Sequence, residues 1–343
     1  MKFLRNIFVL GMIGFIAWVQ FYRIEGIEGL KVLPRGEGPS MIDDLRAMLN
    51  RPQPSDGIGQ LSSLRTEPLI FPASEQAELA GTHNLPTSIR LGTFNLHQFS
   101  RRKIGDSDVM GRLVGLLREM DVIAVQEIDA DRRDLLPKLV EQLNRSGRRF
   151  DYLAGPKIGP IGFEQRLAFV FDRDRVEADR SQTYTMSDPA DQMAYEPLVA
   201  WFRTIGVPPS SAWTFSMANV YFDPDNAQRE QALLSTIYQS IQSDGRGEDD
   251  IILAGCFWVG SRTSAARPES LLFAARRTPT DIYARRQTAN IAFSRHATTE
   301  FRGDCGTIDF LRQHNMTIAE AESISEYLPV WADFQVSEDQ QIL

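Results

Sequence analysis

Short apolar runs separated by polar segments recur along the chain from Ser88 onward. Each run is only a few residues long and is rich in Val, Ile, Leu and Phe at consecutive positions, which is typical of strands buried on both faces. These runs predict strands at 89–96, 122–125, 167–171, 198–202, 215–221, 251–254, 291–293 and 328–334.

Three segments between these strands carry apolar residues at helical spacing instead. In 108–120 they are Val109, Leu113, Leu116 and Leu117, and 133–143 and 228–241 follow the same pattern. Because strands outnumber helices, the pattern predicts an α/β domain of two packed sheets with helices outside them.

The N-terminus has a different pattern. Residues 7–19 are all apolar or glycine, and no charged residue lies between Arg5 and Arg23. A helix over all the uncharged residues between these two arginines would be about 25 Å long, which predicts a single membrane span. Lys2 and Arg5 precede it, so we expect a cytoplasmic N-terminus and a main domain on the extracytoplasmic side. The alternative is a cleaved signal peptide and a secreted protein, which is disfavoured because bulky Phe21 and Tyr22 follow the run.

Segment 25–87 is interrupted by prolines, glycines and serines and predicts a juxtamembrane spacer, with one short helix at 41–50. The expected organisation is therefore an anchor at 1–24, a spacer at 25–87 and one domain at 88–338.

The net charge of −8 gives no basic surface for a phosphate backbone. This disfavours a generic nucleic-acid-binding module more than a nuclease in which a divalent metal offsets the repulsion. The two cysteines, Cys256 and Cys305, are too few for a disulfide framework. We expect both to be free, and a single bridge is the alternative.

Polar residues stand at the ends of three predicted strands: Asn95, Glu127 and Glu164. Buried strands hold such side chains rigidly beside a cleft, although a single one is more often a cap or a loop contact. The order of the three residues along the chain is more informative than any one of them. Five later segments continue the series: Glu196-Pro197-Leu198, Asn219-Val220-Tyr221, Gly255-Cys256-Phe257-Trp258, Asn290-Ile291 and Ser325-Glu326-Tyr327.

From about 89 to 336 this series resembles the endonuclease/exonuclease/phosphatase superfamily, which has the DNase I-like fold. The resemblance implies a four-layer α/β/β/α sandwich and Mg²⁺-dependent attack of water on a phosphoester, assisted by two histidines. It further implies that Asn95 and Glu127 hold the metal and that Glu164 orients one histidine. Glu326 keeps a carboxylate that could also bind the metal, one methylene longer than the family's aspartate.

Six other positions depart from the family pattern. Tyrosines replace both histidines and an arginine, a cysteine and an alanine replace aspartates, and a tryptophan replaces an asparagine. The substituted positions are Tyr195, Tyr221, Cys256, Trp258, Ala289 and Tyr327.

His97 lies two residues after Asn95 and is the one histidine expected to substitute as a catalytic base, although a surface role is commoner for such a residue. A zinc site of Cys256, Glu127 and Glu326 is a second alternative, and a buried, inert Cys256 is favoured over it.

The sequence therefore predicts a membrane-held, catalytically inactive or severely impaired member of the superfamily that acts as a binding or structural module. Its partner is an unidentified ligand or protein, it has Mg²⁺ only if a metal is retained, and the aromatic replacements are expected to pack the old cleft shut. The alternative is a residual Mg²⁺-dependent phosphodiesterase, phosphatase or nuclease that uses Glu127 and Glu326.

Overall fold

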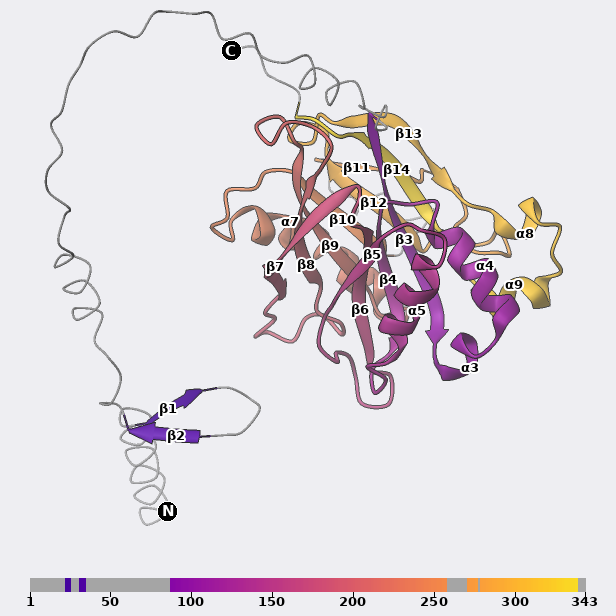
Figure 1. Ribbon diagram of the computed structural model, residues 1–343, viewed down its shortest axis with the longest axis horizontal. Coiled ribbons are helices and arrows are strands. Elements are labelled where there is room, and N and C mark those ends of the chain that lie inside the picture. Colours follow the sequence, from indigo (N-terminus) through magenta and orange to yellow (C-terminus); the bar gives the residue numbers. More distant parts are fainter. Residues whose placement is uncertain (1–21, 26–30, 35–86, 258–269, 277, 339–343) are drawn as a thin grey trace, which may run out of the picture. The chain divides into compact units, whose positions relative to one another are not determined.

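The structure is a computed structural model (Figure 1) that describes residues 22–25, 31–34, 87–257, 270–276 and 278–338. The chain divides into two units, Met1–Glu75 and Gln76–Leu343, which are described separately. In the first unit, strands β1 (Tyr22–Glu25) and β2 (Lys31–Pro34) pair antiparallel.

The helices expected at 7–19 and 41–50 lie outside the described residues. Residues 22–24, expected to end the anchor, belong to β1, and part of the expected spacer is β2. Among the helices that the structure describes, none combines the length and apolar character needed to cross a bilayer.

The second unit contains two mixed sheets of six strands each. In the first sheet the strands lie in the order β13 (Phe301–Thr307), β14 (Val330–Gln335), β3 (Ser88–Phe99), β4 (Val122–Asp129), β6 (Gln165–Asp172) and β5 (Phe150–Ala154). In the second sheet the order is β11 (Leu271–Phe273), β12 (Ala289–Ser294), β10 (Ile251–Cys256), β9 (Thr214–Tyr221), β8 (Leu198–Thr204) and β7 (Val176–Thr185).

The main core lies between the inner faces of the two sheets. Side chains such as Phe169 and Phe334 from the first sheet share one buried cluster with Phe202 and Phe215 from the second. The Trp213 ring stacks between Phe215 and Phe334, at centroid distances of 4.3 and 5.0 Å. Each such side chain contributes roughly 1.5 to 3 kcal/mol by leaving water, so this layer fixes the sheets against each other.

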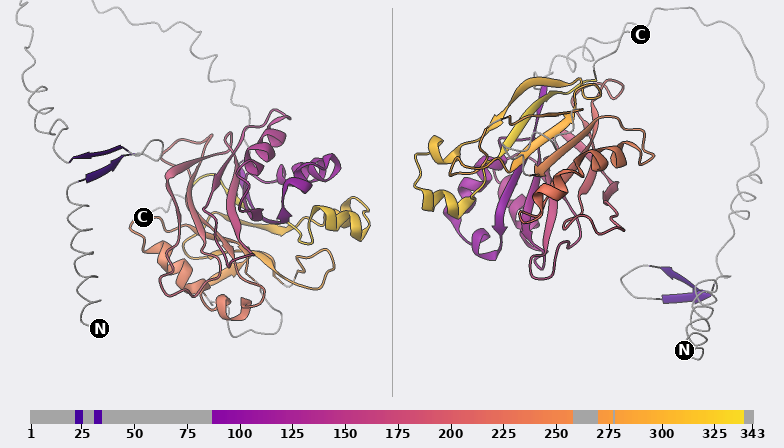
Figure 2. Two further views of the ribbon diagram at one scale, coloured as in Figure 1. Left: turned by 90° about the horizontal axis from the view of Figure 1, so that it is seen from below. Right: turned by 180° about the vertical axis from the view of Figure 1, so that it is seen from behind.

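Helices cover the outer faces, as the left view of Figure 2 shows with purple and orange helices on opposite sides of the sheets. The apolar sides of α4 and α5 pack on the first sheet, and those of α7 pack on the second. The helices are α3 (Arg101–Ile104), α4 (Ser107–Leu117), α5 (Leu135–Asn144), α6 (Ala227–Gln231), α7 (Leu234–Gln242), α8 (Phe310–Gln313) and α9 (Ile318–Ile324).

The prediction of two packed sheets with helices outside is confirmed, and every predicted strand is present. Several predicted bounds differ from the observed ones; for example, α4 ends at Leu117 and not at 120. The last strand begins at Val330 and not at 328. The helix expected over 228–241 is two helices, because the Ala232 and Leu233 backbone N–H groups bond only three residues back and interrupt the α-helical ladder.

Candidate functional site

Each sheet contains one parallel pair of strands, β3 with β4 and β9 with β10. The carboxyl ends of these strands carry Asn95, Glu127, Tyr221 and Cys256. Hydrogen bonds join Asn95 to Glu127 and Tyr221 to Glu127, so residues from both sheets meet at one end of the sandwich. Within the second sheet, Gly255 permits the close approach of β10 to β9, because a Cβ there would lie 1.8 Å from the Val220 carbonyl oxygen.

The backbone at this end leaves regular strand geometry. The pairing of β3 with β4 shifts register between Asn95 and Phe99, and that of β4 with β6 shifts between Val125 and Ile128. Within these bulges His97, Gln98 and Glu127 have φ angles of 47°, 54° and 58°. Left-handed conformations are unfavourable for residues other than glycine, so the surrounding contacts hold them in place.

The Glu127 carboxylate accepts three hydrogen bonds. Its Oε1 atom accepts from Asn95 Nδ2 at 2.7 Å and from the Tyr221 hydroxyl at 3.0 Å. Its Oε2 atom accepts from the Gln98 backbone N–H at 3.1 Å. Of the roughly four acceptor sites of a carboxylate, most are therefore occupied by donors from the protein itself.

Gln165 also positions Glu127, because its Oε1 atom accepts the Glu127 backbone N–H at 2.7 Å. Sequence reasoning missed this residue. The signal was its place at the start of the strand beside Glu164, but a glutamine there does not indicate its partner.

Tyr221 and Cys256 are both protonated groups in this environment. Burial, and then the Glu127 charge, raise the pKa of the Tyr221 phenol and of the Cys256 thiol. Tyr221 therefore keeps its proton, donates a hydrogen bond to Glu127 and does not act as a base. The Cys256 sulfur lies 3.6 Å from Asn95 Nδ2, and the thiol is buried. Both features are consistent with the predicted buried, unreactive cysteine.

His97 stands between the two carboxylates that were expected to bind metal. Its Nδ1 atom is 3.8 Å from Glu127 Oε2, and its Nε2 atom is 3.8 Å from Glu326 Oε1. Both distances are too long for hydrogen bonds. The structure thus brings Glu127, His97 and Glu326 together, with the imidazole separating the two acids.

Tyr195 packs on Tyr221, with ring centroids 4.9 Å apart at 84°. Its hydroxyl donates to the Phe163 carbonyl oxygen at 3.0 Å, and burial raises the pKa of Tyr195 to about 12. Gly159 makes room for the ring, since a Cβ at this position would lie 2.3 Å from Tyr195 Cε1.

A cavity of about 670 Å³ opens beside these residues. His97, Glu127, Glu164, Tyr195, Tyr221 and Tyr327 are among its lining residues. Among the described residues the three tyrosines stand on the wall of the cavity, where Tyr195 and Tyr221 pack edge to face without filling it. Whether the aromatic replacements together pack the cleft shut stays a prediction, because it includes Trp258. Trp258 lies outside the described residues.

Glu164 lines the cavity but makes its own local contacts. It accepts from the Gly162 backbone N–H at 2.9 Å and pairs with Lys157 at 3.3 Å. Backbone hydrogen bonds, including that from Gly162, lower the pKa of this carboxyl group. Ala289 is fully buried, and its backbone N–H donates to Thr280 Oγ1 at 3.0 Å.

The other histidines are placed away from the carboxylates. His296 lies in the turn after β12, and His314 caps the end of α8. His83 lies outside the described residues. Of the three histidines that the structure describes, His97 alone lines the cavity.

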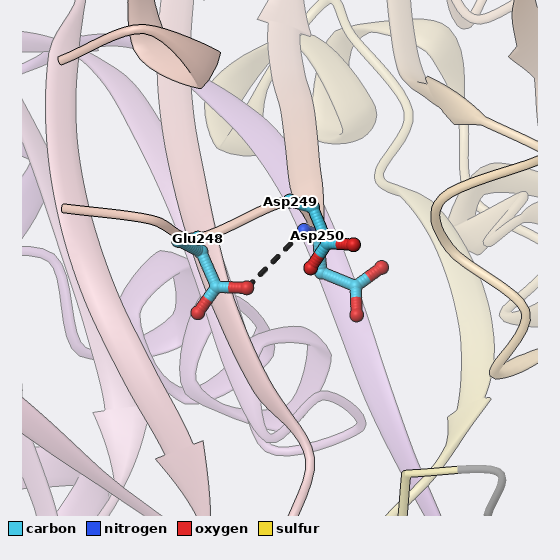
Figure 3. A group of neighbouring side chains, drawn as sticks. All are labelled: Glu248, Asp249 and Asp250. Carbon is cyan, nitrogen blue, oxygen red and sulfur yellow. Dashed lines mark hydrogen bonds between the residues drawn. The ribbon is translucent and has the colours of Figure 1, made fainter. Parts of the chain in front are cut away.

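The described part of the cavity contains no cluster of three or more side chains able to hold a metal ion. Among described residues, the clusters of three or more acidic, cysteine or histidine side chains lie elsewhere, and one of them is drawn in Figure 3. Cys256, Glu127 and Glu326 do not form such a cluster, so the zinc alternative lacks a geometric basis in the described part of the chain. Glu127 faces hydrogen-bond donors where a cation would need free oxygens, so the arrangement does not fit a preformed magnesium site.

No family model matches the chain. It is similar to human deoxyribonuclease gamma, with 23% identity over 271 residues that cover 73% of this chain and 87% of that protein. Horse (Equus caballus) deoxyribonuclease-1 is 24% identical over 274 residues, covering 74% and 94%.

Among solved structures, humanized D. rerio TDP2 matches with a TM-score of 0.50 at 13% identity, covering 73% of this chain and 100% of that one. An endonuclease/exonuclease/phosphatase family protein from Bacteroides thetaiotaomicron matches with a TM-score of 0.50 at 14% identity, covering 75% and 97%. The chain is therefore similar in sequence to deoxyribonucleases and shares the two-sheet fold of the endonuclease/exonuclease/phosphatase (DNase I-like) structures.

Proposed function

We propose that this domain is a catalytically inactive or severely impaired member of its superfamily that binds a ligand in the cavity without hydrolysing it. The observation that carries the proposal is the state of Glu127, whose carboxylate accepts hydrogen bonds from Asn95, Tyr221 and Gln98. A carboxylate held in this way serves as an internal acceptor and not as a ligand of a catalytic metal.

The missing base supports the same proposal. Water attack on a phosphoester needs a group that takes up a proton near neutral pH. Tyr221 stands where the resemblance expects one of the two histidines. Because its pKa is raised, the phenol keeps its proton and cannot take up another near neutral pH. Burial also raises the pKa of Tyr327, which stands where the other histidine is expected.

The cavity supports binding as the remaining role. Its walls carry three tyrosines, which offer flat apolar faces together with polar edges. The ligand of this proposal is a small molecule or a protein side chain with an aromatic or apolar group, and bulk nucleic acid is disfavoured by the net charge of −8.

The proposal includes attachment to a membrane through the uncharged run 7–19, with the N-terminus cytoplasmic and the domain on the other side. Carbonate extraction of membranes, followed by protease protection of sealed vesicles, tests both points. A secreted product shortened at its N-terminus would show instead that the run is a signal peptide.

A second candidate is a residual Mg²⁺-dependent phosphodiesterase, phosphatase or nuclease that uses Glu127 and Glu326, with His97 as the base. Two observations favour it: the cavity in front of Glu127 is open, and the similar proteins from human and horse are named deoxyribonucleases.

One experiment separates the candidates. The full-length chain, purified in detergent, is incubated with plasmid DNA or bis(4-nitrophenyl) phosphate in millimolar Mg²⁺ or Mn²⁺. The inactive domain gives the same background rate as its Glu127→Ala variant. Turnover that Glu127→Ala abolishes, while the exposed-site control Glu141→Ala retains it, would overturn the proposal in favour of the residual enzyme.

A further inference from the structure

The charged side chains that line the cavity of about 670 Å³ are mostly acidic. Three of them are the carboxylates of Glu127, Asp129 and Glu164. The lining residues in the described part of the chain include no lysine and no arginine, and His97 is the basic residue among them. This wall therefore favours a positively charged ligand and opposes an anion such as a phosphate.

Asp129 is the acid with the most free capacity. Its Oδ1 atom accepts from the Asp131 backbone N–H at 3.0 Å. No ion pair joins its carboxylate to a basic side chain within the described ranges, and its second oxygen has no hydrogen-bond partner there. Asp129 is half-buried at the end of β4, so the fold holds this carboxylate at the cavity wall.

Glu127 and Glu164 keep part of their capacity to accept hydrogen bonds. A carboxylate has roughly four acceptor sites. Glu127 accepts three hydrogen bonds, while Glu164 accepts from the Gly162 backbone N–H and pairs with Lys157. Their side chains are 17% and 25% exposed. A ligand that donates hydrogen bonds can therefore reach either acid without displacing its present partners.

Aromatic rings make up much of the remaining wall. Tyr195, Tyr221 and Tyr327 line the cavity, and so does Phe163, whose side chain is 76% exposed. The faces of such rings attract cations through their quadrupole, and an exposed ring that lines a cavity is stabilised when a ligand covers it. Aromatic faces beside carboxylates suit an organic cation better than a metal ion, which would use only the oxygen atoms.

We propose that the ligand of the cavity is an organic cation, with a guanidinium group preferred over an ammonium group. This inference rests on the ligand-binding role proposed above. A guanidinium is planar and weakly hydrated, stacks on aromatic rings and donates in its plane to carboxylates. Its charge lies beside Asp129 and Glu164, and its apolar part packs against Phe163 and the tyrosines. The group belongs either to a free small molecule or to an arginine side chain of a protein.

The test compares three probes of similar shape and different charge on the full-length chain in detergent. Butylguanidinium is positive, butylurea is neutral and butyl phosphate is negative. Saturation-transfer nuclear magnetic resonance should give butylguanidinium a Kd on the order of 1 mM. Butylurea should bind about 10-fold more weakly or worse, because it lacks the charge. Butyl phosphate should give no more signal than it does with detergent alone.

A second pair of probes identifies the source of the group. A blocked glycyl-arginyl-glycine peptide is compared with the same peptide in which neutral citrulline replaces arginine. The arginine peptide should bind more tightly than the citrulline peptide. If it also binds more tightly than butylguanidinium, the natural ligand is a protein side chain, and the reverse order indicates a free small molecule.

Variants decide whether these residues make the contacts. Asp129→Asn keeps the oxygen that accepts from Asp131 and should weaken binding of butylguanidinium about 5-fold or more. Phe163→Ser changes an exposed ring, so the chain should fold, and binding should weaken about 2- to 5-fold. Glu141→Gln removes one negative charge from an exposed position on α5 and should leave the Kd unchanged.

Several outcomes would overturn the inference. They are absence of butylguanidinium binding, equal binding of butylurea, tighter binding of butyl phosphate, and an unchanged Kd in both Asp129→Asn and Phe163→Ser. Equal binding of the neutral probe would leave the ligand-binding role in place and remove only the preference for charge. Failure of the inactive role has a separate readout, which is phosphoester turnover that depends on Glu127, because butylguanidinium contains no bond to hydrolyse.

Discussion

The Tyr221 hydroxyl donates a hydrogen bond to Glu127 Oε1 across 3.0 Å, and so connects the last residue of β9 in one sheet to the bulge of β4 in the other. Tyr221, where the resemblance leads us to expect a histidine, thus holds the carboxylate beside which a metal would have been expected.

Removing this hydroxyl should destabilise the domain. A hydrogen bond to a charged group contributes roughly 1.5 to 3 kcal/mol, so Tyr221→Phe is expected to lower the free energy of unfolding by about 2 kcal/mol in urea titration. Tyr327→Phe is the matched control, because the described contacts of Tyr327 include no hydrogen bond from its hydroxyl, and it should change stability by less than about 0.5 kcal/mol. Equal effects of the two variants would contradict a special role for Tyr221.

Glu127→Gln should also be destabilising. The amide replaces one acceptor oxygen by an NH₂ group that faces donors from Asn95, Tyr221 or Gln98. We expect a loss of about 1 to 3 kcal/mol in the free energy of unfolding. Carboxylates kept for catalysis commonly cost stability, so their removal is often stabilising. A rise in melting temperature in Glu127→Gln would therefore argue for a retained catalytic site.

Cys256→Asp tests whether a metal site can be rebuilt. The new carboxylate would lie beside the Asn95 amide that Glu127 already uses, in a position that is 2% exposed. An uncompensated buried charge costs about 3 to 5 kcal/mol, so the variant should melt well below the parent chain. Millimolar Mg²⁺ should restore part of this loss. Cys305→Asp, at the partly exposed thiol, is the control and should show no magnesium-dependent recovery.

Lys103 should make stability depend on alkaline pH. Its Nζ atom donates to the carbonyl oxygens of Leu96, His97 and Ile324, and burial lowers its pKa from 10.5 to about 8. Between pH 8 and 10.5 the unfolded chain therefore holds a proton that the folded chain has lost, so stability should rise with pH over this range.

The magnitude of this effect is on the order of 1 to 3 kcal/mol, since one pKa unit corresponds to about 1.4 kcal/mol. Comparing urea titrations of the parent chain with those of Lys103→Met isolates the contribution, because other titrating groups are shared. The stability of the parent relative to the variant should increase from pH 8 to pH 10.5. A difference that stays constant or shrinks would show that the lysine keeps its ordinary pKa in the fold.

The strands that the sequence predicted are those whose residues are buried on both faces, such as β10, in which all six residues are buried. Two of the strands that were missed, β7 and β13, are edge strands with many exposed polar residues, and alternation there is too weak to detect. Helix α6 was merged with α7 because apolar periodicity does not register the tight i→i−3 turn at Ala232 and Leu233 that separates them.

The candidate site was predictable in its members but not in its contacts. Asn95, Glu127 and Tyr221 follow from their order at strand ends, whereas the direction of each hydrogen bond depends on the two sheets meeting. The left-handed backbone at His97, Gln98 and Glu127 has no sequence signal either, because none of these residues is glycine. Likewise, Asp129, Glu164 and Tyr327 are far apart in the chain, and tertiary packing alone brings them to one cavity.

Strand β10 begins directly after Asp250 and ends at Cys256, so Asp250 and the cavity are about 20 Å apart along one strand. Because β10 is paired with β9 on one side and β12 on the other, this separation is fixed by the fold. A spin label at the exposed position of Asp249 would broaden the resonances of any molecule held beside Tyr221 by an amount that depends on distance, and nuclear magnetic resonance could then locate that molecule without a crystal.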